Sequence, residues 1–125
     1  MQPKPHVLIA EDEVLAAMAL ESILIRAGFR VTCAYDGEKA LAAQAVDPPD
    51  ILVTDIRMPR MDGRQLIREV RQTLADLPII IMTGFISRTG VDELRGEGSG
   101  PIEVIPKPIS PREIVATIRR LIAQA

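Results

Sequence analysis

The sequence contains little cysteine and few aromatic residues. Its 125 residues include one cysteine, no tryptophan, one tyrosine and two phenylalanines. A disulfide needs two cysteines and a Cys-based zinc site needs several, so the lone Cys33 excludes both within this chain. We interpret Cys33 as a small hydrophobic residue. So few aromatic side chains also leave little material for stacking nucleic-acid bases, and we expect no direct nucleic-acid binding.

The sequence also lacks an excess of charge of one sign and any long apolar run. Fifteen Lys and Arg residues nearly balance seventeen Asp and Glu residues, which gives no overall attraction to nucleic acid or an anionic membrane. No apolar run approaches the roughly 20 residues that span a bilayer, and the start does not have the pattern of a signal peptide. We therefore expect a cytoplasmic protein without membrane contact, monomeric or weakly dimeric.

The 47% hydrophobic content of this chain is enough for one domain with its own core. We expect a tail over residues 1–5 and a domain over residues 6–125. Within the domain, short apolar segments alternate with segments of helical periodicity. The expected strands are residues 6–10, 29–35, 51–54, 78–83 and 102–105. The expected helices are residues 15–27, 37–46, one containing 66–74, one within 90–100, and one from residue 111.

Continuous apolar strands that alternate with helices favour a parallel sheet covered on both faces. The second and fifth strands have the weakest apolar continuity and are expected at the edges. This predicts an α/β, flavodoxin-like fold: a doubly wound five-stranded parallel sheet of order 2-1-3-4-5, flanked by five helices. Residues 90–100 hold four of the eight glycines, so the fourth helix is expected to be short or mobile.

Polar residues follow four of the expected strands and should meet at the carboxyl edge of the sheet. These residues are Glu11, Asp12, Asp55, Thr83, Gly84 and Lys107. Carboxylates placed close together repel one another unless cations intervene, and oxygen-only ligands suit Mg²⁺ or a similar hard ion. A carboxylate beside such an ion and a lysine is a plausible acceptor of a phosphoryl group.

Four segments in order resemble the receiver domain of two-component response regulators. They are EDE at 11–13, TDIRMPRMDG at 54–63, MTG at 82–84 and PKP at 106–108. The resemblance covers essentially the whole chain. It implies a phosphorelay protein that accepts a phosphoryl group from a histidine kinase or histidine phosphotransfer protein and turns over no separate substrate.

The resemblance also implies a role for each matching residue. Asp55 corresponds to the phosphoacceptor, and Mg²⁺ (or Mn²⁺) would bind Asp12, Asp55 and the Arg57 backbone carbonyl. Glu11 would complete the metal site indirectly, through water. Three further positions correspond to groups that contact the phosphoryl oxygens: Lys107, Thr83 and the Gly84 amide. In this family the bond corresponding to Lys107–Pro108 is usually cis.

The sequence departs from the family pattern in ways that affect signalling. Val104 stands where the family usually has the aromatic switch residue, and GEGSGPIE replaces the usual small-residue turn before the last strand. Arg57 and Phe85 occupy the two variable positions that tune how fast the phosphate is lost. These departures leave open a receiver-like interaction module that does not switch. A haloacid-dehalogenase-type phosphatase is less favoured, because its Asp-x-Asp motif would need an aspartate where Arg57 stands.

The first helix carries apolar residues on both of its faces. Its core face is expected to comprise Ala16, Ala19, Leu20, Ile23, Leu24 and Ala27. The opposite face would then comprise Ala17, Met18, Glu21, Ser22 and Ile25. An apolar surface of this kind suits docking on a helical partner, with Ala17, Met18 and Ile25 as the contact residues. Ala-rich helix propensity alone explains the pattern equally well.

Overall fold

The computed structural model describes residues 3–84 and 100–124. The strands are β1 (His6–Ala10), β2 (Arg30–Ala34), β3 (Ile51–Asp55), β4 (Ile79–Thr83) and β5 (Ile102–Pro106). The helices of the described part are α1 (Val14–Arg26), α2 (Gly37–Val46), α3 (Gly63–Arg71) and α5 (Pro111–Gln124). The helix expected within residues 90–100 falls almost entirely outside the described residues.

The five strands form one parallel sheet in the order β2-β1-β3-β4-β5, as predicted. β1, β3 and β4 are buried on both faces, whereas the two edge strands are partly exposed. Edge strands contact only one neighbouring strand, so they tolerate the polar residues that gave them weaker apolar patterns.

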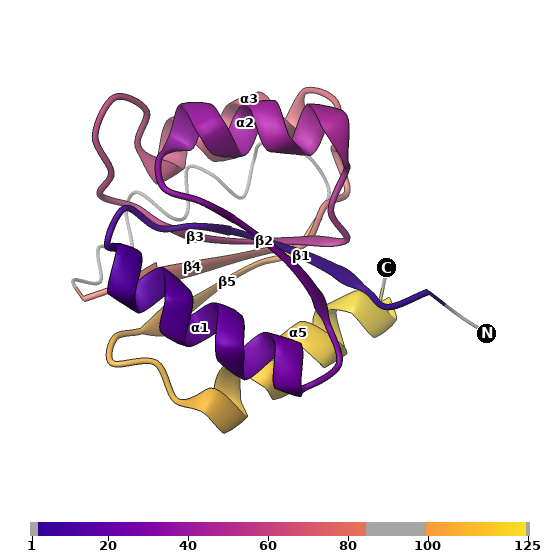
Figure 1. Cartoon of the computed structure of the whole chain (residues 1–125). Helices are drawn as coiled ribbons and strands as arrows, with labels where there is room; N and C mark the ends of the chain where they lie inside the picture. The colour runs from indigo at the N-terminus through magenta and orange to yellow at the C-terminus, as the bar shows by residue number, and fades with distance from the viewer. Residues whose placement is uncertain (1–2, 85–99, 125) are drawn as a thin grey trace.

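Helices cover both faces of this sheet. α2 and α3 lie on one face, and α1 and α5 lie on the other (Figure 1). Successive strand residues point to opposite faces, so Leu8 packs under α2 and α3 while Val7 and Ile9 pack against α1 and α5. The strands read as continuous apolar runs because both faces are covered by helices.

Polar caps define where three helices begin. The Asp36 carboxylate accepts a hydrogen bond from the Lys39 amide at 2.8 Å, and Asp62 accepts one from the Gln65 amide at 2.9 Å. The Ser110 hydroxyl accepts a hydrogen bond from the Glu113 amide at 3.4 Å. Pro111 follows as the first residue of α5, as the sequence predicted for the last helix. α3 ends at Arg71, so Leu74, expected on its apolar face, lies just beyond the helix and still packs on the core.

Candidate functional site

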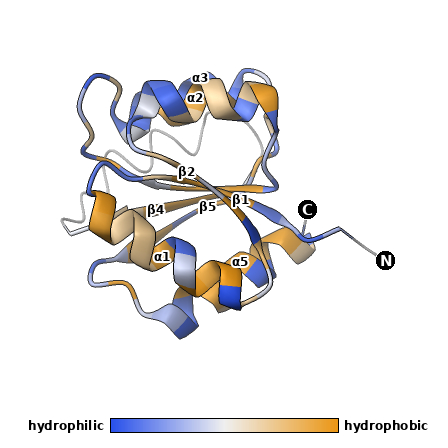
Figure 2. Cartoon of the chain, in the orientation of Figure 1, coloured by the Kyte–Doolittle hydropathy of each residue, from blue (hydrophilic) through white to orange (hydrophobic). Residues whose placement is uncertain are grey.

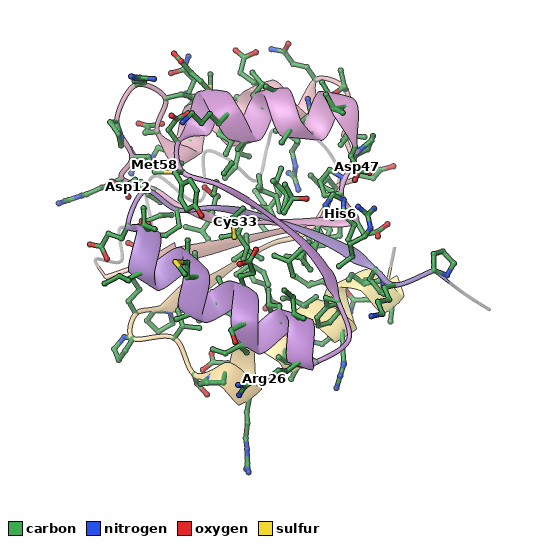
Figure 3. The ribbon with its side chains drawn as sticks, viewed as in Figure 1. His6, Asp12, Arg26, Cys33, Asp47 and Met58 are labelled. Atoms are coloured by element: carbon green, nitrogen blue, oxygen red, sulfur yellow. The ribbon has the colours of Figure 1, made fainter. Side chains whose placement is uncertain are left out.

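The carboxyl ends of β1, β3, β4 and β5 bring the predicted polar residues to one edge of the sheet. Asp12 and Met58 lie at this edge, and His6 and Asp47 lie at the opposite end of the strands (Figure 3). Parallel strands all end at the same edge, so the segments after them converge there although they are far apart in sequence.

Three carboxylates gather at this edge. Glu11, Asp12 and Asp55 each offer an oxygen within 4.8 Å of the others. Glu11 is buried, Asp55 is half-buried and Asp12 is exposed. The cluster therefore opens to solvent on the side of Asp12 and is closed on the side of Glu11.

The Asp55 carboxylate is held by hydrogen bonds on both of its oxygens. Oδ1 accepts the backbone amide of Ile56 at 2.7 Å and that of Arg57 at 3.4 Å. Oδ2 accepts Lys107 Nζ at 2.7 Å. These contacts orient the carboxylate without enclosing it, since the Asp55 side chain keeps 14% of its surface exposed.

Lys107 pairs with two of the three carboxylates. Its backbone amide donates to the Thr83 carbonyl at 2.9 Å, which fixes the start of the β5–α5 connection. Its ammonium group reaches Asp55 Oδ2 and also Glu11 Oε1 at 2.9 Å. Partial burial lowers the pKa of Lys107, but the two carboxylate partners outweigh burial and raise it overall, so the lysine stays charged. The Lys107–Pro108 peptide is cis, as the resemblance implied.

Glu11 is the buried member of the carboxylate cluster, with 3% of its side chain exposed. Burial raises the pKa of Glu11, although the hydrogen bond and charge of Lys107 lower it; the nearby Asp55 raises it further. One ammonium group thus faces more negative charge than it balances. A divalent cation would supply the missing positive charge, and an all-oxygen donor set suits Mg²⁺ or Mn²⁺.

The loop between β3 and α3 is packed closely against the site. The Gly63 amide donates to the Ile56 carbonyl at 2.8 Å, and a β-carbon at Gly63 would lie 2.2 Å from the Asp55 carbonyl oxygen. On the other side of the loop, a β-carbon at Gly37 would lie 2.3 Å from the Met61 carbonyl oxygen. These close approaches require glycine at both positions and hold the segment after Asp55 in place.

The other predicted site residues lie around this centre. Thr83 is buried at the end of β4, and Gly84 and Arg57 are exposed. Val104 is partly buried and packs against the core beneath α2 and α3. Phe85, predicted to tune the phosphate lifetime, lies outside the described residues.

The assignment of faces on α1 was partly wrong. Ala17 is fully buried and lies on the core face with Leu20 and Leu24, so it is not a docking residue. Ala16 and Ala19, expected in the core, are exposed. The sequence did not define the rotation of this helix, because it is apolar nearly all round and its alanines fit either face. Contact with β2 decides it, where Cys33 Sγ lies 3.9 Å from the Ala17 carbonyl.

Met18 and Ile25 are exposed as predicted, at 52% and 53%, and Leu15 joins them at 82%. Leu15, Met18 and Ile25 recur at helical spacing, and we call them the α1 stripe. The helix begins with a hydrophobic turn (Figure 2). Beside it, a hollow of about 260 Å³ is lined by Ala16, Ala19 and Pro108, with Glu11 and Lys107 in its wall. The exposed apolar surface of α1 thus continues to the charged site.

The sequence interpretation missed Arg64. It lines an open hollow of about 590 Å³ together with Asp12, Arg57 and Asp62, next to the carboxylate cluster. Its position directly after Gly63, where the loop after Asp55 ends, could have indicated this location.

The fold and the site together define a doubly wound α/β domain with an acidic, lysine-containing site at the carboxyl edge of its sheet. Residues 7–119 match the response regulator receiver domain family, and the chain belongs to that family. It is therefore a receiver domain of the kind that serves in two-component signalling.

Named relatives agree with this assignment. The response regulator MprA of Mycobacterium ulcerans is 37% identical over 118 residues, which are 94% of this chain and 50% of the relative. The chemotaxis protein CheY4 of Vibrio cholerae superposes with a TM-score of 0.88 at 26% identity, over 95% of this chain and 99% of that one. The receiver domain of Francisella response regulator 1452 superposes with a TM-score of 0.84 at 26% identity, over 97% of this chain and 98% of that one.

The chain spans about half the length of the curated relatives it matches. Across the described residues, none of the helices combines the length and apolarity needed to cross a membrane.

Proposed function

We propose that Asp55 accepts a phosphoryl group from the phosphohistidine of a histidine kinase or histidine phosphotransfer protein. An Asp55 oxygen would form a bond to phosphorus while the phosphorus–nitrogen bond breaks. The electron pair of that bond would leave on the imidazole. The observation that carries this proposal is the orientation of Asp55 by two backbone amides and Lys107, with part of its carboxylate still exposed. A carboxylate held in this way needs little reorganisation to attack.

The surrounding residues would share the remaining tasks. Asp12, Asp55 and the Arg57 carbonyl would hold Mg²⁺ or Mn²⁺, with Glu11 contributing through water. The ion, when bound, would neutralise charge on the transferred oxygens. Lys107 would exchange its contact with Asp55 Oδ2 for one with a phosphoryl oxygen. The Thr83 hydroxyl and the Gly84 amide would donate further hydrogen bonds to that group.

The direct test is labelling of the purified chain by acetyl phosphate, or binding of beryllofluoride, with and without Mg²⁺. We expect labelling that requires the metal and disappears in Asp55→Asn. Asp47→Asn is the matched control, since Asp47 lies at the opposite end of the strands (Figure 3) and should leave labelling unchanged. Labelling that persists in Asp55→Asn would remove Asp55 from this role.

We also propose that the α1 stripe docks the helical bundle of the kinase. Its residues are exposed, and the neighbouring hollow continues the apolar surface to Glu11 and Lys107. Met18→Glu combined with Ile25→Glu should slow phosphotransfer from a cognate kinase and leave labelling by acetyl phosphate intact. The control is Val46→Glu, because Val46 is 87% exposed on α2, across the sheet from α1. Equal transfer rates in the stripe variant and the control would reject this surface.

A module that does not switch is the second candidate, and Val104 favours it. Val104 packs against the core beside Ile81 and is too small to swing between an outward and an inward position as a large aromatic ring would. NMR spectra with and without beryllofluoride separate the two candidates. Shifts that spread beyond the residues of the site support a switch, and shifts confined to the site support a static module.

A further inference from the structure

The hollow at the entrance to the site, here called the entrance hollow, is lined by two arginines. Its wall consists of Asp12, residues 56–59 with Arg57 among them, Asp62 and Arg64. It is adjacent to the phosphoacceptor position, because Asp12 belongs to the carboxylate cluster and residues 56–59 directly follow Asp55. Of the two acids, Asp62 already accepts the Gln65 amide as the cap of α3.

Arg64 is held against this hollow by the start of α3. Gly63, the preceding residue, packs on the Asp55 backbone and donates its amide to the Ile56 carbonyl at 2.8 Å. Arg64 is half-buried, and its Nε is buried with no hydrogen-bond partner among the described residues. Its Nε is therefore shielded from solvent, and Arg64 as a residue contributes to the wall of the hollow.

Helix stability does not account for a cation at this position. The first turn of α3 contains no acidic residue, although the positive end of the helix dipole favours one. Arg68 and Arg71, in the last turn, lie where the dipole favours cations. Arg64 and Arg57 thus bring two positive charges to the entrance, which also holds the carboxylates of Asp12 and Asp62.

We propose that Arg64 is a specificity-determining residue for the phosphodonor, favouring donors whose leaving group departs as an anion. This inference rests on the proposed phosphorylation of Asp55. With an acyl phosphate, an Asp55 oxygen bonds to phosphorus, the bond from phosphorus to the acyl oxygen breaks, and the carboxylate leaves with the electron pair. With phosphoramidate, whose nitrogen already carries the extra proton near neutral pH, the phosphorus–nitrogen bond breaks and the nitrogen leaves with the electron pair as neutral ammonia. A guanidinium at the entrance stabilises the first leaving group more than the second.

The experiment measures phosphorylation rates with acetyl phosphate and with phosphoramidate, in Mg²⁺, by intact mass. The variants are Arg64→Gln, Arg64→Lys and, as a matched control, the exposed Arg68→Gln from the same helix. In Arg64→Gln the acetyl phosphate to phosphoramidate rate ratio should fall roughly three- to tenfold, the range expected for losing one nearby charge close to the surface. Arg64→Lys should restore most of the ratio, and the effect should shrink at high salt.

The rate ratio separates specificity from a structural role, because a misplaced α3 would slow both donors alike. An unchanged ratio in Arg64→Gln, or an equal fall in Arg68→Gln, would overturn the inference while leaving the proposed function intact. If the unchanged chain takes no Asp55-dependent label from either donor, the proposed function fails and this inference fails with it.

Discussion

At the scale of single residues, the site is governed by an imbalance of charge. Glu11 and Asp55 both contact Lys107, and Asp12 adds a third carboxylate to the cluster. The raised pKa values of Glu11 and Lys107 follow from this arrangement, since burial penalises one anion while two anions retain the ammonium proton. Such an imbalance destabilises the metal-free fold and favours binding of a divalent cation.

Glu11→Gln tests the cost of the buried carboxylate. Burial raises the pKa of Glu11 in the folded state, so the folded state holds this proton more tightly than the unfolded chain does. The contribution of Glu11 to stability is therefore full below its unfolded pKa and is lost as pH rises through the folded pKa. The quantity to compare is the free energy of unfolding of Glu11→Gln minus that of the unchanged chain. In EDTA this difference should become more positive as pH rises from about 4.3 towards neutrality. Urea titrations at several pH values measure this, with the exposed Glu38→Gln as control. A difference that does not vary with pH would contradict the prediction.

At the scale of elements, close backbone contacts position the reacting groups. The β3–α3 loop is held between the amino end of α2 and the end of β3 through contacts at Gly37 and Gly63. Arg60, with a φ of 69°, lies in this loop, and its guanidinium is 3.9 Å from the Asp36 carboxylate. The site therefore depends on helix starts and loop backbone as much as on its charged side chains.

Gly63→Ala should be more damaging than Gly28→Ala, although Gly28 is the glycine with a positive φ. The new β-carbon would collide with backbone atoms of Asp55 and Ile56, and overpacking of this kind costs roughly 3 kcal/mol. Gly28→Ala meets nothing within 4 Å and costs only the strain of a φ of 98°, about 1 kcal/mol. Chemical denaturation followed by far-UV circular dichroism compares the two. Equal losses would mean that the loop can shift away from Asp55.

At the scale of the whole molecule, two apolar layers on either side of the sheet hold the fold together. Polar contacts of a buried arginine add to the apolar layer beneath α3. Arg71, 5% exposed at the end of α3, donates to the carbonyls of Leu77, Gly100 and Pro101 at 3.1, 2.6 and 3.3 Å. It thereby ties α3 to the segments that begin β4 and β5.

Arg71→Met should lower global stability by about 3 kcal/mol, because hydrogen bonds from a charged donor are lost and the buried Leu77 carbonyl is left without that donor. Arg68→Met, on the exposed face of the same helix, should change stability by less than about 0.5 kcal/mol. The midpoints of urea denaturation measure this difference, provided that the slopes of the free energy of unfolding against urea concentration are the same in both variants. A loss as small as that of Arg68→Met would mean that other contacts hold these strand starts.

Metal binding should stabilise the whole fold through the carboxylate cluster. Mg²⁺ at about 100 times its dissociation constant should add about 2.7 kcal/mol, seen as a higher melting temperature that EDTA reverses. Asp12→Asn should reduce this gain. The control Glu13→Gln, which lies next to the cluster but outside the set of three, should keep it. A gain that is the same in Asp12→Asn would place the ion elsewhere.

The sequence by itself determined the alternation of strands and helices, the edge positions of β2 and β5, and the residues that follow each strand, including Asp12, Asp55 and Lys107. These features follow from local periodicity and from the rule that parallel strands end at one edge. Only the tertiary structure decided the rotation of α1, the burial of Glu11, the location of Arg64 beside the site and the contacts of Arg71. Each of these depends on which distant segment packs against the residue, and a pattern of neighbours along the chain does not contain that information.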